Sequence, residues 1–266
     1  MFYLNGEPFN IQHFPDNTQK IEYNPYGNKF TIHWKYENDE ELFTLYCLVN
    51  HIREKRDFNS QISLILPYIA NARMDRVKND DEVFTLKYFC KAINAMNFEW
   101  VKVLDPHSNV AAGLLDRVIV ENVDIYIEDA MEQIKFNYEH DFALFFPDEG
   151  ARKRYDKVVD REEVAFGIKE RDWKTGEIKG LHIFGEENVK DRNVLIIDDI
   201  CSRGGTFYHS AKALKKAGAN KVFLYVTHCE DTIFKGNLQE SGLIEHVYTT
   251  DSIFKSENET EWITIV

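Results

Sequence analysis

The sequence of 266 residues lacks the marks of exported, membrane-bound and unfolded proteins. Its four cysteines lie far apart without a C-x-x-C pair, which argues against a zinc site or a disulfide framework and favours a reducing compartment. No apolar run approaches the roughly 20 residues of a membrane span, and the N-terminus lacks the features of a signal peptide. No long Gly, Pro, Ser or Gln tract suggests disorder. We therefore expect a globular protein of the cytoplasm with no membrane partner.

Positive charge is also scarce. The chain has 32 Lys and Arg against 45 Asp and Glu, giving a formal charge of -13. Such a surface repels a phosphate backbone, so nucleic acid is not an expected partner. A small anion can still bind where a few basic side chains and backbone N–H groups converge, with a divalent cation screening the acids. The sequence therefore directs the search to local anion sites.

Short apolar runs alternate with helical patterns along the chain, which is typical of βαβ units whose parallel strands are buried on both faces. This pattern predicts an α/β fold with mainly parallel sheets. A soft boundary in the polar residues 137–141 divides the chain into domains 1–138 and 139–266, and the polar residues 170–184 are expected to form a mobile loop or hairpin. The strand-like runs are residues 62–66, 100–104, 142–146, 194–197 and 222–226, and the clearest helical patterns are residues 85–97 and 206–217.

The strongest motif is VLIIDDICSRGGTF, residues 194–207. An apolar strand leads to Asp198 and Asp199, and a short loop with Gly204 and Gly205 leads to a helix expected to open at Thr206. N–H groups of such a loop and of the first helical turn form an anion cradle, and glycine lets the backbone approach a phosphate closely. The paired carboxylates can bind sugar hydroxyls or a hydrated metal. The plain alternative is a strand-end cap followed by an ordinary turn.

This segment resembles the loop that binds phosphoribosyl diphosphate (PRPP) in type I phosphoribosyltransferases and PRPP synthetases. Its usual form is an acid pair, two variable residues, Asp or Ser, then Thr-Gly-Gly-Thr. The resemblance implies two phosphoribosyltransferase-like domains, with Asp198 and Asp199 on the ribose hydroxyls. It also implies that the 5-phosphate is bound by the loop residues Ser202, Arg203, Gly204, Gly205 and Thr206.

Three further segments favour the synthetases. The first is ILPYIANARMDR, residues 65–76, which resembles their ATP-binding segment and implies that Arg73, Asp75 and Arg76 contact ATP. Clustered guanidinium groups suit a triphosphate because they bind its oxygens in pairs. Met74 replaces the usual Gln. Without the resemblance, an Arg and Asp salt bridge at a solvated helix start explains these residues equally well.

The second segment is VLDPHSNVAAGLLD, residues 103–116, which is similar to the synthetase strand that ends in Asp-x-His. The similarity implies that His107 coordinates the metal on ATP or orients its phosphates, with Asp105 as a partner or direct ligand. The alternative is a structural histidine at a strand end.

The third segment is FGIKER, residues 166–171, with FFPDEG at residues 145–150 upstream. It resembles the strand that begins the catalytic loop of the synthetases, which implies that Lys169 and Arg171 stabilise the migrating diphosphoryl group. Glu170 replaces the usual middle Arg. Asp148 matches a family acid expected near the ribose and its metal. Taken alone, a Lys-Glu-Arg run on a surface means nothing.

The N-terminal 60 residues fit the family loosely. Phe14 and Asp16 resemble part of an adenine-binding hairpin, although Asn17 and Thr18 replace its Gly-Glu. They join the expected ATP site on this resemblance alone.

The combined resemblance implies an ATP-dependent diphosphokinase that transfers diphosphate to the anomeric hydroxyl of a ribose 5-phosphate group and releases AMP. It implies Mg²⁺ as cofactor and a homo-oligomer, a dimer or higher. Two alternatives stay open: a phosphoribosyltransferase that consumes PRPP, and a non-catalytic regulatory relative. The residues expected near metal are Asp105, His107, Asp148, Asp198 and Asp199.

The acceptor stays open as well, because Ser202-Arg203 stands where Asp-Thr is usual. A long cation with five donors can reach a second phosphate beyond the first. ADP-ribose presents such a diphosphate and a free anomeric hydroxyl, and phage-type synthetases that resemble this family act in NAD resynthesis. Alternatively, Arg203 strengthens binding of the ordinary 5-phosphate.

Overall fold

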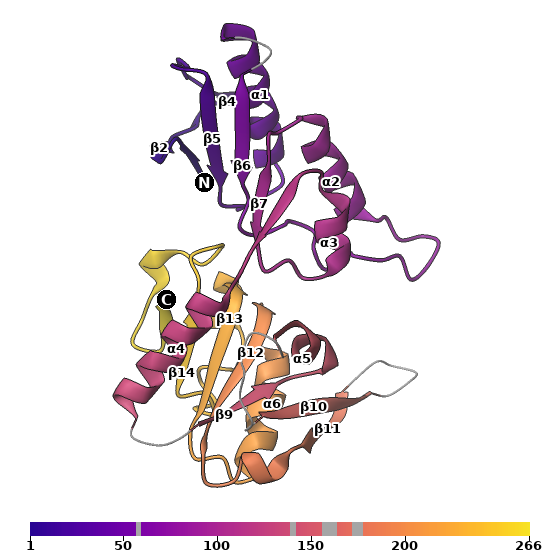
Figure 1. The fold of residues 1–266 in the computed structure, drawn as a ribbon, viewed down its shortest axis with the longest axis vertical. Coiled ribbons are helices and arrows are strands. Elements are labelled where there is room, and N and C mark those ends of the chain that lie inside the picture. The colour runs from indigo at the N-terminus through magenta and orange to yellow at the C-terminus, as the bar shows by residue number, and fades with distance from the viewer. Residues whose placement is uncertain (57–59, 139–141, 156–163, 172–177) are drawn as a thin grey trace. The chain divides into compact units, whose positions relative to one another are not determined.

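The computed structural model describes residues 1–56, 60–138, 142–155, 164–171 and 178–266. The chain divides into two compact units, Met1–Asn122 and Val123–Val266 (Figure 1). Both units are built from a mainly parallel sheet with helices, so the predicted α/β class is confirmed. Within the described ranges, none of the helices is both long and apolar enough to span a bilayer.

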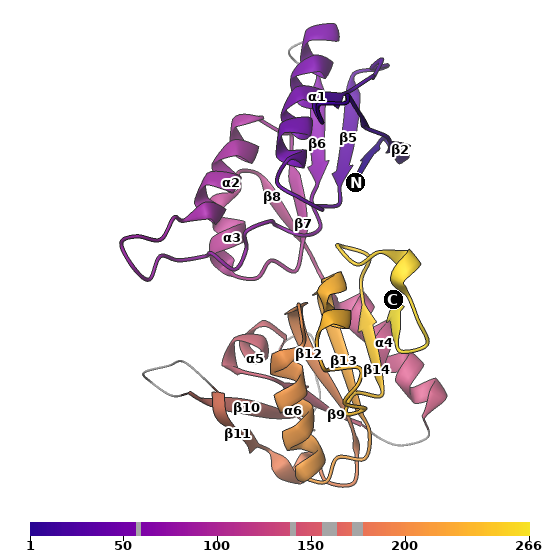
Figure 2. The same ribbon diagram turned by 180° about the vertical axis from the view of Figure 1, so that it is seen from behind.

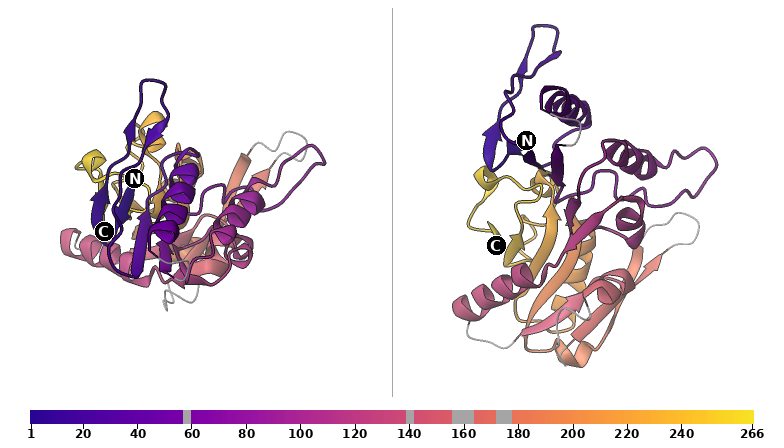
Figure 3. Two further views of the ribbon diagram at one scale, coloured as in Figure 1. Left: turned by 90° about the horizontal axis from the view of Figure 1, so that it is seen from above. Right: turned by 45° about the horizontal axis from the view of Figure 1, so that its top comes forward.

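The first unit contains a six-stranded sheet in the order β2-β1-β5-β6-β7-β8. Strands β5 to β8 run parallel, and β1 pairs antiparallel with β2 and β5. A separate hairpin of β3 (Gln12–His13) and β4 (Gln19–Lys20) projects from this sheet (Figure 3). The other elements are β1 (Phe2–Leu4), β2 (Glu7–Phe9), β5 (Lys29–Trp34), α1 (Glu41–Lys55), β6 (Gln61–Ile65), α2 (Thr85–Ala95), β7 (Val101–Leu104), α3 (Asn109–Leu114) and β8 (Val118–Glu121).

The second unit contains a seven-stranded sheet in the order β11-β10-β9-β12-β13-β14-β15. Neighbouring strands run parallel except β10 and β11, which form an antiparallel hairpin. Helices α4 and α6 cover opposite faces of the sheet (Figures 1 and 2). The elements are α4 (Asp124–Asn137), β9 (Phe142–Phe146), α5 (Glu149–Tyr155), β10 (Val164–Arg171), β11 (Ile178–Phe184), η1 (Glu186–Asn188), β12 (Asn193–Cys201), α6 (Gly205–Lys216), β13 (Val222–Cys229), η2 (Asp231–Lys235), β14 (His246–Thr249), η3 (Ser256–Asn258) and β15 (Ile263–Ile265).

Helix α4 lies in the second unit, whereas the sequence pattern predicts a soft boundary between residues 138 and 139. At the end of the helix, the ring of Tyr138 lies 4.8 Å from that of Phe223 on β13. The ammonium of Lys221 lies 4.7 Å from the same ring. The polar residues that suggested a boundary follow α4 instead of preceding it, so the compact second unit begins at Val123.

Continuous apolar strands explain why the sheet of the second unit is buried on both faces. Every residue of β9 and of β13 is buried, as two covering layers of helices require. Such strands leave only their ends for polar chemistry. In open parallel sheets, ligands bind at the carboxyl ends of the strands, and the predicted site residues Asp105, Asp148 and Asp198 lie at or near such ends.

Candidate functional site

The predicted phosphate loop joins β12 to α6. Strand β12 runs on past the acid pair to Cys201, and α6 begins at Gly205, one position before the expected start. Gly204 precedes the helix with a positive φ of 74°. A Cβ atom there would lie 2.8 Å from Leu238 Cδ2, so both the backbone conformation and the packing require glycine. The loop therefore leads directly into the N-terminus of α6, where free backbone N–H groups and the helix dipole favour the binding of an anion.

The acid pair lies directly before this loop. Asp199 is buried and forms an ion pair with Arg154 of α5, with Nη1 and Oδ2 2.9 Å apart. Burial raises the pKa of Asp198 well above its usual value, and the charges of Asp199 and Asp148 raise it further. The backbone N–H of Asp199 donates to Asp198 Oδ1 at 3.0 Å and opposes this rise. The structure therefore brings three carboxyl groups together, with one guanidinium beside them.

Asp148 lies where α5 begins. Its Oδ1 atom accepts the backbone N–H groups of Gly150 at 3.0 Å and of Ala151 at 3.1 Å. This capping fixes the carboxylate at the carboxyl end of β9, beside the strand that carries the acid pair. The sequence predicts that Asp148 and Asp198 lie near the same metal, and the charge of Asp148 does raise the pKa of Asp198.

These three acids fit Mg²⁺ by the chemistry of their donors. Magnesium prefers oxygen ligands, and in nucleotide enzymes it takes one or two carboxylates while water and phosphate oxygens complete its shell. Among the described residues, no cluster of three His, Cys, Asp or Glu side chains is arranged to hold a metal. A cation held by these acids would take its remaining ligands from water and from phosphate oxygens.

The first unit brings Asp75, Arg76 and His107 together in the segments that follow β6 and β7. The guanidinium of Arg76 donates to both oxygens of the buried Asp75 carboxylate, at 2.7 and 3.0 Å. Arg76 is the main cause of a lowered pKa at Asp75, and the nearby Ser108 hydroxyl and His107 lower it further. The salt bridge proposed as an alternative for this segment is thus present, and the Arg76 side chain is still 73% exposed. Arg73 is exposed as well.

Asp105 is held in an unusual conformation. It is buried after β7 with a φ of 39°, in the left-handed region that aspartate tolerates better than most residues. His107 follows it and is partly exposed. Strained backbone of this kind persists where the surroundings fix it, often at ligand sites.

The N-terminal hairpin has the geometry of a tight turn. Asp16 Oδ1 accepts the N–H of Thr18 at 3.0 Å and its hydroxyl at 2.7 Å, and these bonds lower the pKa of Asp16. Thr18 thus fixes the carboxylate of Asp16 within the turn, and Phe14 is half exposed.

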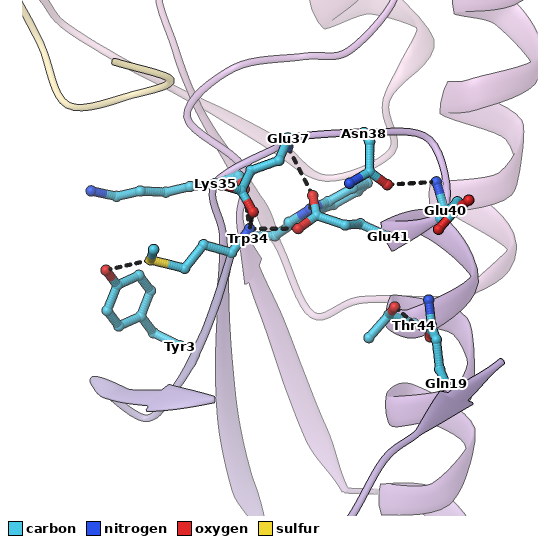
Figure 4. Close-up of polar contacts among 10 residues, drawn as sticks. Tyr3, Gln19, Trp34, Lys35, Glu37, Asn38, Glu40, Glu41 and Thr44 are labelled. Carbon is cyan, nitrogen blue, oxygen red and sulfur yellow. Dashed lines mark hydrogen bonds and ion pairs between the residues drawn. The ribbon is translucent and has the colours of Figure 1, made fainter. Parts of the chain in front are cut away.

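The base of the hairpin is tied to α1. The hydroxyl of Thr44 donates to Gln19 Oε1 at 2.7 Å (Figure 4). Nearby, the buried carboxylate of Glu41 accepts the indole N–H of Trp34 at 2.8 Å. These bonds fix α1 against β5 and against the hairpin.

Lys169 and Arg171 lie on β10, opposite Leu181 and Ile178 of β11, with a register shift between Glu170 and Arg171. The hairpin expected around residues 170–184 is therefore present. The side chains of Lys169 and Arg171, and residues 172–177 of the predicted loop or hairpin, lie outside what the structure describes.

Two side chains of the second unit were not predicted from the sequence. Arg154 forms an ion pair with Asp199, and Glu230 accepts a hydrogen bond from Ser202 Oγ at 2.7 Å. The only sequence signal for Arg154 is the basic run of residues 152–154 after Pro-Asp-Glu-Gly. Glu230 follows the expected strand 222–226 in VFLYVTHCEDTIFKGNL, a segment that continues the resemblance through Thr227-His228 and Gly236-Asn237 without giving Glu230 a role.

Comparison with known proteins identifies the class. Residues 121–265, more than half of the chain, match the phosphoribosyl transferase domain model. The chain therefore belongs to the phosphoribosyl transferase domain family.

The wider likeness extends over both units. A ribose-phosphate pyrophosphokinase of Thermococcus kodakarensis is 28% identical over 223 residues, which cover 82% of this chain and 76% of the relative. The enzyme of that name from Shewanella oneidensis is 29% identical over 225 residues, covering 81% and 67%. A crystal structure of phosphoribosylpyrophosphate synthetase from Mycobacterium smegmatis has the same fold, with a TM-score of 0.78 at 17% identity, covering 97% of this chain and 85% of that chain. The predicted resemblance to the PRPP synthetase family is confirmed.

Proposed function

We propose that this protein is an ATP-dependent diphosphokinase that converts ribose 5-phosphate to PRPP and releases AMP. The observation that carries the proposal is that the likeness to ribose-phosphate pyrophosphokinases covers about four fifths of the chain and so includes both units. A phosphoribosyltransferase needs the acid pair and the glycine loop but has no need of the ARMDR and DPH segments of the first unit.

Each half of the chain takes one substrate in this proposal. In the first unit, Arg73 and Arg76 bind phosphate oxygens of ATP, while Asp75 orients Arg76 through two hydrogen bonds. His107 and Asp105 act on the metal carried by ATP. The hairpin with Phe14 and Asp16 contacts the adenine.

In the second unit, Asp198 and Asp199 bind the ribose hydroxyls, and residues Ser202 to Thr206 bind the 5-phosphate. The anomeric hydroxyl attacks the β-phosphorus of ATP in line, and AMP leaves. Lys169 and Arg171 stabilise the negative charge on the migrating group. We assign no side chain as general base.

Magnesium is part of the proposal. It would supply charge neutralisation and alignment of the phosphates. Asp148, Asp198 and Asp199 would hold a cation with the ribose, and a cation would also relieve the repulsion that raises the pKa of Asp198. Titration with Mg²⁺ should therefore give a binding signal that depends on ribose 5-phosphate and disappears in Asp199→Asn.

The decisive assay measures products from ATP and ribose 5-phosphate. We expect AMP and PRPP in equal amounts, with activity lost on chelation of Mg²⁺. Production of inorganic diphosphate from PRPP and a base, without AMP, would instead identify a phosphoribosyltransferase. Binding of both substrates without any turnover would favour the regulatory relative.

One observation keeps ADP-ribose as a second candidate acceptor. The side chain of Arg203 is exposed at the phosphate loop and forms no ion pair with another described residue. It is therefore available for a second phosphate. The test compares kcat/KM for ribose 5-phosphate and ADP-ribose in the unmodified protein, in Arg203→Thr and in the control Lys212→Thr on the exposed face of α6. A loss confined to ADP-ribose in Arg203→Thr supports this acceptor, whereas an unchanged preference for ribose 5-phosphate removes it.

We also propose a homo-oligomer, a dimer or higher, on the resemblance to the synthetases. Light scattering after size-exclusion chromatography tests it, and a mass of 31.3 kDa would identify a monomer.

A cytoplasmic location suits the cysteines. All four are free thiols, and three of them are buried. Reduced thiols persist in the cytoplasm. Fractionation of the source cells tests this location.

A further inference from the structure

The phosphate loop packs against residues 230–238, which we call the support segment. The backbone N–H of Glu230 donates to the carbonyl of Cys201 at 2.8 Å, extending the pairing of β12 and β13 to the point where the loop begins. A Cβ atom on Gly236 would lie 2.0 Å from the carbonyl oxygen of Arg203. Leu238 closes the space beside Gly204 in the same way, so the segment touches the loop at successive residues.

The carboxylate of Glu230 in this segment accepts hydrogen bonds from two hydroxyls, one on the loop and one on the segment itself. Ser202 Oγ donates to Glu230 Oε2 at 2.7 Å, and Thr232 Oγ1 donates to the same oxygen at 2.9 Å. The two hydroxyl oxygens lie 3.0 Å apart. A hydroxyl has one proton to donate, so in this arrangement the proton of Ser202 is used by Glu230 and is not offered to a ligand.

We propose that Glu230 is a positioning residue of the phosphate loop. It fixes Ser202 and thereby the first turn of the loop, so that the 5-phosphate is bound by backbone N–H groups instead of by the Ser202 hydroxyl. Hydrogen bonds to a carboxylate are short and strong, which suits the fixing of a glycine-containing loop that has little stiffness of its own. This inference rests on the proposed binding of a ribose 5-phosphate group by the loop.

The experiment compares Glu230→Ala, Glu230→Gln and Ser202→Ala with the unmodified protein. Asp231→Ala is the matched control within the same segment, because the carboxylate of Asp231 accepts a bond from Asn258 at 2.9 Å instead of a bond from the described loop residues. Calorimetry measures the Kd of ribose 5-phosphate, and the AMP assay gives KM for both substrates. Circular dichroism and thermal unfolding show that each variant is folded.

Losing one hydrogen bond to a charged group corresponds to roughly a 10- to 100-fold change in an equilibrium constant. We therefore expect Glu230→Ala to raise the Kd and KM of ribose 5-phosphate about 10- to 100-fold, with KM for ATP changed less than about threefold. Glu230→Gln keeps an acceptor and should recover most of the affinity. Ser202→Ala should resemble Glu230→Ala, and Asp231→Ala the unmodified protein.

The outcomes separate this inference from the proposed function. Equal ribose 5-phosphate affinity in all folded variants overturns the positioning role, and so does an equal rise in KM for both substrates. If Glu230→Ala fails to fold, Glu230→Gln and Ser202→Ala decide the question by the same criteria. Normal binding of ribose 5-phosphate without AMP release overturns the proposed function and leaves the positioning role standing. Absence of binding by the unmodified protein overturns both.

Discussion

Removal of the Arg154 cation should destabilise the second unit, and Arg154→Met is the variant that shows it. Methionine keeps much of the apolar stem but removes the charge that lies 2.9 Å from Asp199 Oδ2. Breaking a buried ion pair from one side costs about 3–5 kcal/mol. Because the Arg154 side chain is 24% exposed, solvent screening reduces the expected loss to about 2–3 kcal/mol. For a unit of this size, that loss lowers Tm by about 5–10 °C.

Urea unfolding followed by circular dichroism at pH 7 measures this loss. Lys153→Met is the matched control on the same helix, because Lys153 pairs with Glu149 on the surface, where both side chains are about three quarters exposed. The control should leave the free energy of unfolding unchanged within error. A double-mutant cycle of Arg154→Met with Asp199→Asn should give a coupling above about 1 kcal/mol. A loss below about 0.5 kcal/mol in Arg154→Met, or additive effects in the cycle, would refute the reasoning.

Three further predictions concern single side chains. The pKa of Asp198 is raised in the folded state, so its contribution to stability is present below its usual pKa of 3.8 and is lost as the pH rises through the raised value. Asp198→Asn should remove this loss, and urea unfolding should therefore show that the substitution increases the free energy of unfolding more at pH 7 than at pH 4. Lys169→Ala should lower kcat by several orders of magnitude and leave the Kd of ATP within about tenfold, because its contact is made in the transition state, and near-normal turnover would remove it from the mechanism. His107→Ala should shift the dependence of rate on Mg²⁺ concentration, and an unchanged dependence would make this histidine structural.

The phosphate loop could be predicted from sequence because its determinants are contiguous. An apolar strand, two acids and a glycine pair before a helix follow one another within 14 residues, and the structure keeps this order in β12, the loop and α6. The alternation of apolar runs likewise identified β6 and β7 of the first sheet and β9, β12 and β13 of the second. Local signals of this kind depend on backbone periodicity and turn chemistry, which the sequence carries directly.

The partners of the loop could not be predicted in the same way. Arg154 reaches Asp199 from a helix 45 positions earlier in the chain, and Glu230 reaches Ser202 from the end of a neighbouring strand. The place of helix α4 could not be predicted for a related reason. The composition of α4 assigns it to neither sheet, whereas its place in the compact unit Val123–Val266 follows from packing such as that of Tyr138 on Phe223.

Positions 202 and 203 of the loop differ in how the rest of the fold meets them. The family pattern has Asp or Ser at position 202, and here the carboxylate of Glu230 lies within 2.7 Å of the Ser202 hydroxyl. The start of the loop therefore has an acid beside it, supplied by the residue that follows β13. Arg203 has no such replacement: its carbonyl is fixed against Gly236, while its guanidinium extends into solvent. The contact of Ser202 with Glu230 should preserve the start of the loop, whereas the exposed guanidinium of Arg203 is available to bind a different acceptor at the proposed phosphate site. Differences in acceptor choice between this protein and other synthetases should accordingly follow residue 203 and not residue 202.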